Sequence, residues 1–177
     1  MDGGPAIQAD SPARGQAFAA AVAWVISAEG GGKLVTDTGG ATRWGISSDA
    51  HPDVHVESLT REQAETLYYE RYWQPIHAGA LPPAIALVVF DAAVNVGVPR
   101  AVKLLQAILR VEADGVCGPV TVAAAKVAHR SETVAAVLEL RLRYYDGLGR
   151  METYSRYLTG WRLRCMRLAV EAGRWMA

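Results

Sequence analysis

The chain has 177 residues, of which 51% are hydrophobic and 20% are charged, and its 18 basic and 18 acidic side chains give a net charge of zero. This length suits one domain with a full hydrophobic core, and the composition excludes an intrinsically disordered chain. The balanced charge gives no basic excess for a nucleic-acid partner, and two cysteines are too few for a disulfide framework. We expect reduced structural thiols at Cys117 and Cys165, as in a protein made in the cytosol.

The N-terminal part of the chain combines a loose arm with an apolar helix. Glycines and prolines within residues 1–15 predict little regular structure. A helix is predicted from Gln16 to Glu29, and its apolar run, 17–28, is too short to span a bilayer. The run resembles the core of a signal peptide, but cleavage after it would remove the helix that carries Glu29. We therefore expect a buried helix, no conventional export signal and no integral membrane segment.

Glycine, proline and capping residues divide the rest of the chain into further elements. The glycine-rich segment 30–47 predicts a loop or small hairpin, and the capping box Thr60-Arg61-Glu62-Gln63 opens a helix that extends to about Tyr72. Pro82 and Pro83 begin a helix whose apolar residues cover nearly its whole circumference, so we expect it to be the central buried helix. Further helices are predicted at 99–109, at 119–128, from a cap at Ser131, and at 159–175. The predicted fold class is mainly α.

One acidic residue stands out at the boundary between the first helix and the glycine-rich segment. Glu29 follows an apolar helix, and apolar surroundings favour the protonated form of a carboxyl group, as a general acid requires. Asp37, Thr42 and Trp44 follow in the glycine-rich segment and offer a second carboxylate, a hydroxyl and an aromatic surface. Together these are the kinds of group that the cleft of a glycosidase requires. The alternatives are a surface glutamate at a helix end, a turn formed by Asp37, and a Trp44 that packs in the core.

The same stretch carries a family resemblance. Glu29-Gly30-Gly31, then Asp37, then Gly39-Gly40-Ala41-Thr42 with Gly45-Ile46 resembles the signature of the glycoside hydrolase family 108 muramidases, found in phage endolysins and bacterial secretion-activator proteins. Three later segments are similar to the same family, namely 72–75, 90–97 and 104–119. Gly32 stands where the family usually has an aromatic residue, and the loop to Asp37 is one residue short.

The resemblance implies a fold, a division of the chain and an activity. It implies a lysozyme-like helical domain with a short glycine-rich loop or hairpin at the cleft, a catalytic region at 16–98, and a helical C-terminal region at 99–177 packed with it as one domain. It implies hydrolysis of the β-1,4 bond between N-acetylmuramic acid and N-acetylglucosamine in peptidoglycan. In that reaction Glu29 would be the general acid, while Asp37, Thr42 or nearby water would complete the hydrolysis.

The resemblance also bears on partners and location. No cofactor is implied, and we expect a monomer whose partner is the peptidoglycan polysaccharide. For a phage enzyme it implies synthesis in the cytoplasm and release to the cell wall through a holin pore. The alternatives to an enzyme are a non-catalytic wall-binding module and a secretion-assisting protein.

Polar side chains on two later helices are further candidates. Asp91 and Asn95 lie four residues apart on the most apolar helix and share a face. Either they contact acetamido or hydroxyl groups of the substrate, or they tie this helix to a neighbour, and for Asp91 we favour the tie. Arg141, Tyr144 and Tyr145 resemble the family's Arg-x-x-Tyr-Tyr helix, which makes Tyr145 a candidate substrate contact and places Arg141 opposite the glutamate. The alternative is a surface helix with two packed tyrosines.

Three remaining features have structural as well as functional interpretations. His51, Asp53 and His55 alternate, but no further ligand lies at metal-site spacing, which favours a polar loop. The segment 104–121 resembles peptidoglycan-binding modules, and in physical terms it is a helix, turn, helix connection. Residues 141–177 hold eight arginines and three acidic residues. These arginines either solvate the last helix or draw the protein to an anionic wall.

Overall fold

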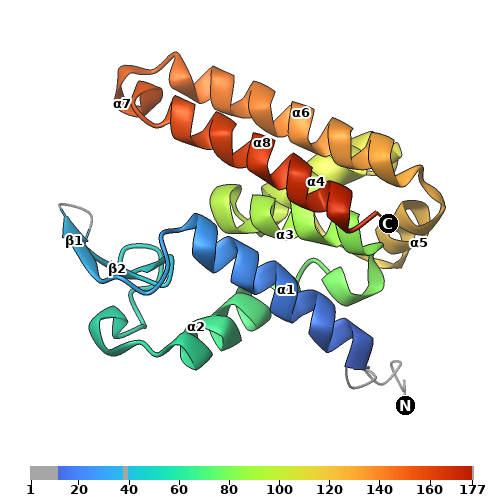
Figure 1. The fold of residues 1–177 in the computed structure, drawn as a ribbon. Helices are drawn as coiled ribbons and strands as arrows, with labels where there is room; N and C mark the ends of the chain where they lie inside the picture. Colours follow the sequence, from blue (N-terminus) through green and yellow to red (C-terminus); the bar gives the residue numbers. More distant parts are fainter. Residues whose placement is uncertain (1–11, 38–39, 177) are drawn as a thin grey trace.

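The computed structural model describes residues 12–37 and 40–176, which form helices and a small antiparallel sheet (Figure 1). The mainly α, lysozyme-like fold class is therefore confirmed. The strands are β1 (Val35–Asp37), β2 (Gly40–Arg43) and β3 (Ile46–Ser47). The helices are α1 (Pro12–Ala28), α2 (Arg61–Tyr68), α3 (Pro83–Val96), α4 (Val98–Leu109), α5 (Pro119–Val127), α6 (Arg130–Gly149), α7 (Glu152–Ser155) and α8 (Leu158–Arg174).

Helix α3 is the central helix, as the sequence predicted. Pro83 occupies its first turn, and every residue from 84 to 93 is buried. Helix α3 contacts α1, α4, α6 and α8. In Figure 1 it lies between α1 and the antiparallel pair formed by α6 and α8. A helix that is apolar all round can be stable only in such a position, because each of its faces needs a packing partner.

Helix α1 begins earlier than predicted. It starts at Pro12, a residue type that favours the first helical position, so the last residues of the expected loose arm are helical. Residues 1–11, the rest of that arm, lie outside the described residues. The apolar face of α1 is buried through Ala21, Val22, Val25 and Ile26. Within the described ranges, no helix is both long and apolar enough to cross a membrane.

The glycine-rich segment folds as a three-stranded antiparallel sheet, which confirms the hairpin prediction. Val35 pairs with Thr42 across β1 and β2, and Arg43 pairs with Ile46 across β2 and β3. Trp44 and Gly45 form the two-residue turn between β2 and β3, with φ of 56° and 77°. Two adjacent residues at positive φ are characteristic of a type I′ hairpin turn, whose twist matches that of the strands.

The indole ring of Trp44 lies over Gly32. A Cβ atom at position 32 would be 2.3 Å from Cη2 of Trp44, so no larger residue fits there while the indole keeps this position. Trp44 Nε1 donates a hydrogen bond to the carbonyl oxygen of Leu59 at 3.1 Å. Trp44 thus occupies the space that a side chain at position 32 would need.

The C-terminal helices differ from the prediction in two details. His129, with extended backbone, is the N-cap of α6, and its carbonyl oxygen accepts hydrogen bonds from the backbone and hydroxyl of Thr133. The predicted cap at Ser131 is therefore wrong, because Ser131 already lies in the first turn. The single-turn helix α7, between α6 and α8, was not predicted. Cys117 and Cys165 are buried free thiols.

Gln106 organises the turn between α4 and α5. Its side chain is buried, and its amide nitrogen donates to Asp114 at 2.7 Å and to the Thr121 hydroxyl at 3.1 Å. Its amide oxygen accepts from the backbone N–H of Gly115 at 2.9 Å. Because a buried amide must satisfy both its donors and its acceptor, this one side chain fixes the conformation of the turn.

Two residues of the His-x-Asp-x-His segment, His51 and Asp53, form a polar cluster with Arg71 and Tyr72. Arg71 pairs with both oxygens of Asp53, at 3.1 and 2.5 Å, and its Nη1 lies 2.7 Å from Nδ1 of His51. The Tyr72 hydroxyl lies 3.0 Å from His51 Nε2. Since arginine can only donate, Nδ1 of His51 accepts and the ring is neutral, with its proton on Nε2. Among the described residues, no group of three or more side chains could hold a metal ion.

This cluster predicts a pH-dependent contribution to stability. Burial, followed by the charge of Arg71, lowers the pKa of His51 below its ordinary value of about 6.5. The unfolded chain therefore binds a proton below about pH 6.5 before the folded chain does. The free energy of unfolding should fall as the pH drops from about 6.5 through the folded pKa, by at most about 1.4 kcal/mol per pH unit for one proton. Denaturant unfolding of wild type and His51→Gln at pH 5 to 7.5 measures this slope, and an equal slope in both proteins would contradict the assignment.

Candidate active site

The backbone geometry at the end of α1 sets the position of Glu29. Gly30, with φ of 91°, donates its N–H to the carbonyl of Ser27 at 3.2 Å, and Gly31 donates to the carbonyl of Ile26 at 2.9 Å. These two bonds form a Schellman motif in which Glu29 is the C-cap and Gly30 takes the left-handed conformation. The glycines after Glu29 therefore end the helix and leave the glutamate at its terminus.

The turn between β2 and β3 packs directly against Glu29. A Cβ atom at Gly45 would lie 2.7 Å from both Cβ and Cγ of Glu29 and 2.4 Å from the Tyr68 hydroxyl oxygen. The Tyr68 hydroxyl donates to the carbonyl oxygen of Trp44 at 3.0 Å, which ties the turn to α2. Only glycine allows this close approach, so Gly45 helps to hold the stem of the glutamate in place.

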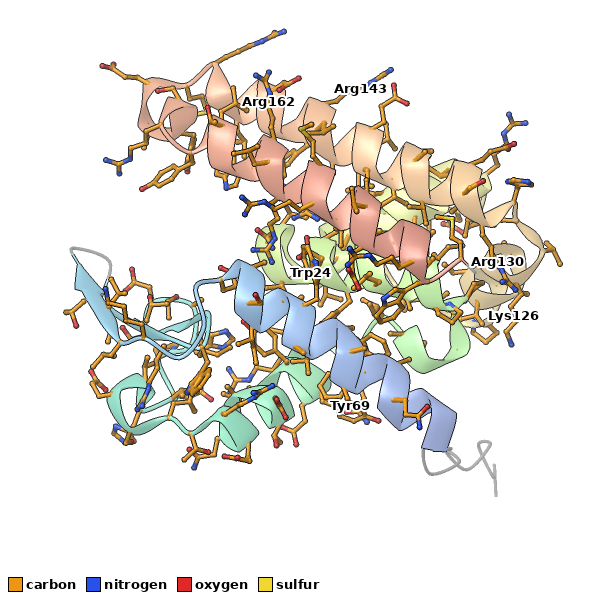
Figure 2. All side chains as sticks on the ribbon, viewed as in Figure 1. Trp24, Tyr69, Lys126, Arg130, Arg143 and Arg162 are labelled. Atoms are coloured by element: carbon orange, nitrogen blue, oxygen red, sulfur yellow. The ribbon has the colours of Figure 1, made fainter. Side chains whose placement is uncertain are left out.

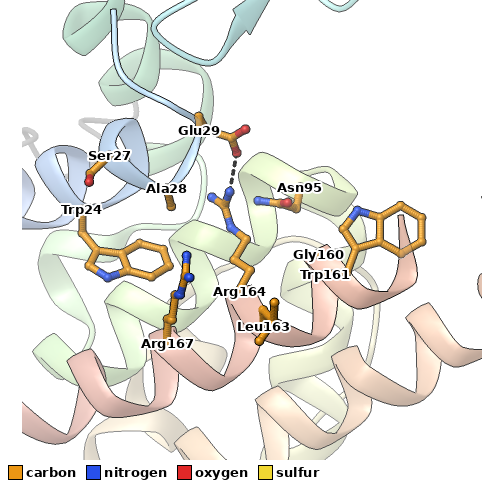
Figure 3. Close-up of a pocket in the computed structure, with 10 residues that line it drawn as sticks. All are labelled: Trp24, Ser27, Ala28, Glu29, Asn95, Gly160, Trp161, Leu163, Arg164 and Arg167. Atoms are coloured by element: carbon orange, nitrogen blue, oxygen red, sulfur yellow. Dashed lines mark hydrogen bonds and ion pairs between the residues drawn. The ribbon is translucent and has the colours of Figure 1, made fainter. Parts of the chain in front are cut away.

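A pocket of about 480 Å³ opens beside Glu29, and Figure 3 shows the side chains that line it. Its walls come from the C-terminal end of α1, the C-terminal end of α3 and one face of α8. The lining residues are Trp24, Ser27, Ala28, Glu29, Asn95, Gly160, Trp161, Leu163, Arg164 and Arg167. Two indole rings, an amide, a carboxylate and two guanidinium groups thus surround a cavity large enough for a sugar unit.

Arg164 binds Glu29 directly. Its Nη1 donates to Oε1 of Glu29 at 2.7 Å, and the side chains of Arg164 and Glu29 are 11% and 27% exposed. On its other edge, Arg164 donates to Oδ1 of Asp91 from Nη2 at 2.6 Å and from Nε at 2.9 Å. The guanidinium is therefore held on two sides, and it fixes the glutamate in a single orientation.

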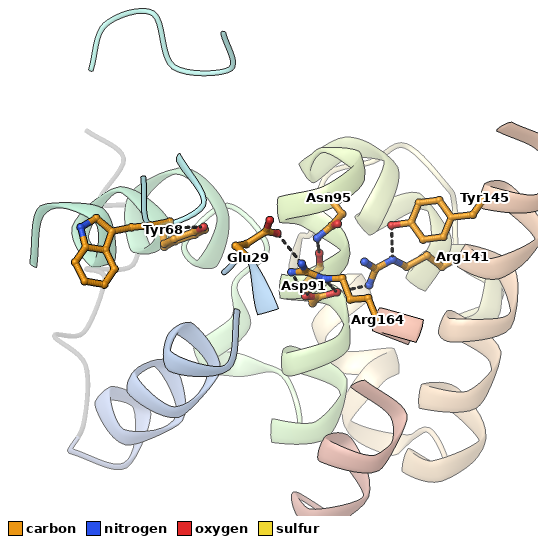
Figure 4. Close-up of polar contacts among 8 residues, drawn as sticks. Glu29, Tyr68, Asp91, Asn95, Arg141, Tyr145 and Arg164 are labelled. Carbon is orange, nitrogen blue, oxygen red and sulfur yellow. Dashed lines mark hydrogen bonds and ion pairs between the residues drawn. The ribbon is translucent and has the colours of Figure 1, made fainter. Parts of the chain in front are cut away.

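Behind Asp91 lies a second, fully buried layer. Arg141 Nη1 donates to Oδ2 of Asp91, and Arg141 Nε donates to the Tyr145 hydroxyl at 2.8 Å. Figure 4 shows the resulting chain from Glu29 through Arg164 and Asp91 to Arg141 and Tyr145. Burial disfavours the charged form of Asp91, but Arg141 and Arg164 outweigh it, so the pKa of this carboxyl is lowered. Asp91 therefore serves as the anion that orients Arg164.

The structure separates the two predicted candidates on α3. Asn95 lines the pocket, as expected for a cleft position, and its Nδ2 donates to the backbone carbonyl of Asp91 at 3.0 Å. Asp91 has no exposed surface and Tyr145 is 2% exposed. Asp91 ties α3 to α6 and α8 through its ion pairs, and Tyr145, a candidate substrate contact, lies beneath the pocket and does not line it. The arginine opposite Glu29 is Arg164 and not Arg141, which lies one layer deeper.

The predicted residues of the sheet lie on a different side of Glu29. Thr42 lies in the middle strand, and Trp44 packs on Gly32, so neither lines the pocket next to Arg164. Asp37 ends β1 opposite Gly40, and its side chain lies outside the described part of the chain. The sheet reaches the glutamate through its Trp44-Gly45 turn.

Several pocket residues were not predicted from the sequence. Trp24 and Trp161 supply the aromatic surfaces that the sequence suggested for Trp44. Arg164 and Arg167 were grouped with the solvated arginines of the last helix, yet both line the pocket. One signal was present: Gly160, Arg164 and Arg167 have the i, i+4, i+7 spacing of a single helix face, and the small glycine leaves room on it. The local sequence does not indicate that this face of α8 lies against α1.

Comparisons with known proteins identify the family of the chain. The family model described as Glycosyl hydrolase 108 matches residues 22–97, and the model described as Predicted Peptidoglycan domain matches residues 100–166. Among solved structures, SagA of Brucella abortus is 32% identical, with a TM-score of 0.80 over 91% of this chain and 96% of that chain. No curated protein has a significant sequence match to the chain. The chain therefore belongs to the glycosyl hydrolase 108 family.

Proposed function

We propose that the protein is an N-acetylmuramidase that hydrolyses the β-1,4 bond between N-acetylmuramic acid and N-acetylglucosamine in peptidoglycan. The observation that carries this proposal is the carboxyl group of Glu29, which is held by Arg164 at the wall of a pocket with two tryptophans. A glycosidase needs a carboxyl group in a fixed position beside a surface that binds sugar rings. The glycosyl hydrolase and peptidoglycan matches support the same substrate class.

In the proposed reaction Glu29 is the general acid. Arg164 engages Oε1, which leaves Oε2 to carry the proton toward the glycosidic oxygen. As the bond between the anomeric carbon and this oxygen breaks, the proton moves to the leaving sugar and a negative charge remains on Glu29. Arg164 stabilises that charge, and a water molecule adds its hydroxyl group to the anomeric carbon and gives its other proton to a carboxylate.

The second catalytic group comes from the sheet. We assign it to Asp37, with Thr42 as the hydroxyl that positions the water. Thr42 lies on β2, which leads into the Trp44-Gly45 turn that contacts Glu29, and Asp37 lies on the neighbouring strand β1. As the second carboxylate, Asp37 would activate the attacking water or stabilise the positive charge that develops at the anomeric carbon.

This assignment predicts the effect of replacing Asp37. Asp37→Asn should lower kcat about a hundredfold and leave KM nearly unchanged, because an interaction made only in the transition state appears in kcat. Steady-state rates on soluble peptidoglycan fragments measure both constants. Asp49→Asn, an exposed aspartate shortly after the sheet, is the matched control and should retain wild-type kcat. A kcat near that of wild type in Asp37→Asn would move the role to Thr42 or to another carboxylate.

The proposed substrate also explains why aromatic and amide side chains line the pocket. Sugar rings present apolar faces that stack on indole rings, and acetamido groups hydrogen-bond with amides. Trp24, Trp161 and Asn95 offer these contacts at the wall of the pocket. Trp24 and Trp161 are thus added to Asn95 among the proposed substrate contacts.

Analysis of the products tests the proposed function. Purified peptidoglycan treated with the protein should release soluble fragments with N-acetylmuramic acid at their reducing ends, which borohydride converts to muramitol for detection by mass spectrometry. Fragments that end in N-acetylglucosamine would contradict the bond assignment. Sedimentation with the wall and no released fragments would support the wall-binding alternative, and the absence of both would support a secretion-assisting protein.

A further inference from the structure

The pocket has two chemically different ends. Figure 3 shows Trp24 and Arg167 on one side of the Glu29–Arg164 pair, and Asn95 and Trp161 on the other. The Trp24 end therefore carries a positive charge beside an aromatic ring. The Trp161 end carries an uncharged amide beside an aromatic ring. A substrate with an acidic group on only one of two neighbouring sugars would bind such a pocket in a single direction.

Arg167 differs from the other arginines of α8 in having no anionic partner. Arg164 is occupied by Glu29 and Asp91, Arg162 pairs with Asp146, and Arg174 pairs with Glu171. Within the part of the chain that the structure describes, no carboxylate lies within ion-pair distance of Arg167. Its side chain is exposed at the pocket wall, one helical turn beyond Arg164. The guanidinium of Arg167 thus lies at the pocket without an ion-pair partner among the described residues.

Peptidoglycan offers a matching group on only one of its two sugars. Muramic acid bears a lactyl ether that ends in a carboxylate or, through an amide, in a peptide stem with carboxylates of its own. N-acetylglucosamine bears no acid. A planar guanidinium binds a carboxylate with two parallel hydrogen bonds, which an ammonium group cannot reproduce.

We propose that Arg167 binds a carboxylate carried by the muramic acid residue and places that sugar at the Trp24 end of the pocket. This inference rests on the proposed function and deepens it, because it names the group that sets the direction of the glycan strand. It also separates peptidoglycan from chitin, whose N-acetylglucosamine units carry no charge. Arg167 is then a specificity-determining residue, and the neutral Trp161 end receives the N-acetylglucosamine side.

Binding measurements in a Glu29→Gln background test this inference without hydrolysis. Isothermal titration would use three tetrasaccharides: a peptidoglycan fragment with its stems, the same fragment after an amidase has removed the stems, and chitotetraose. Arg167→Gln should weaken binding of at least one acidic fragment about tenfold, the loss expected for one charge-assisted contact, and leave chitotetraose unchanged. Arg167→Lys should restore only part of the affinity.

Arg174→Gln is the matched control, since it removes the same charge from the same helix outside the pocket. The acidic fragment that loses affinity identifies the carboxylate, on the stem or on the lactyl group. Equal weakening of chitotetraose, no weakening of either acidic fragment, or the same weakening in Arg174→Gln would overturn the inference. The titration measures binding alone, so it tests the role of Arg167 independently of hydrolysis. A wild-type protein that releases no muramitol-ended products would refute the proposed function, but the titration would still decide the role of Arg167.

Discussion

Glu29→Gln should reduce hydrolysis of peptidoglycan at least a hundredfold, because general acid catalysis contributes about 10² to 10⁴ to the rate. Glutamine keeps the size of the side chain and an oxygen that can accept the hydrogen bond from Arg164, but it has no acidic proton. Since the side chain lies at a partly exposed helix terminus, the fold should be retained. Release of soluble fragments measures the rate, and circular dichroism with thermal unfolding checks the fold.

The matched control for this experiment is Glu139→Gln. Glu139 forms an exposed ion pair with Arg143 on α6, and Figure 2 shows Arg143 and Arg162 on the α6–α8 pair, away from α1. This control should keep wild-type activity. Residual activity above about one per cent of wild type in a folded Glu29→Gln protein would count against Glu29 as the acid.

The second large effect is expected at Asp91. Asp91→Asn should lower the free energy of unfolding by about 3 to 5 kcal/mol, the range found when one partner of a buried ion pair is removed. Arg141 and Asp91 are both 0% exposed, and Nη2 of Arg141 already lacks a hydrogen-bond partner within the described structure. The substitution would leave this buried guanidinium without its anion. It would also release Arg164, so activity should fall together with stability.

Denaturant unfolding at neutral pH measures the loss, and Asp146→Asn is the control. Asp146 pairs with Arg162 on the surface, so this control should change stability by less than about 1 kcal/mol. Because folding lowers the pKa of Asp91, its contribution is complete above about pH 4 and is lost only as the pH falls through the folded pKa. Equal losses of unfolding free energy in Asp91→Asn and Asp146→Asn would show that the buried ion pair contributes no more to stability than the surface pair.

Local signals were sufficient to predict most of the secondary structure. Pro83 and Pro119 begin helices, the Thr60 capping box begins another, and Gly30 ends α1, because each of these residues restricts the backbone in its own neighbourhood. The incorrect prediction of the α6 cap has the same local origin. His129 serves as the cap of α6 through its extended backbone alone, without the side-chain bond that made Ser131 attractive.

The candidate site was predicted only where it depends on local sequence. Glu29 and Asn95 line the pocket, and Trp44, in the turn between β2 and β3, packs on Gly32. The partners of Glu29 come from α8, and helical spacing cannot tell which of several arginine-bearing faces meets α1. The Arg-x-x-Tyr-Tyr pattern placed Arg141 opposite Glu29, but Arg141 pairs with Asp91 one layer deeper, because its position depends on how α6 and α8 stack on α3.

The pair of Glu29 and Arg164 joins residues that are 135 positions apart in the chain. During synthesis, Glu29 is added to the chain roughly 7 to 27 s before Arg164, at ordinary rates of translation. Throughout that interval the glutamate lacks the guanidinium that holds it, and until Arg164 is added Asp91 can pair only with Arg141. Docking of α8 is thus a late, non-local step that completes the site. Recovery of activity on refolding would therefore report when α8 docks, and a nascent or truncated chain without α8 would carry Glu29 without the arginine that holds it.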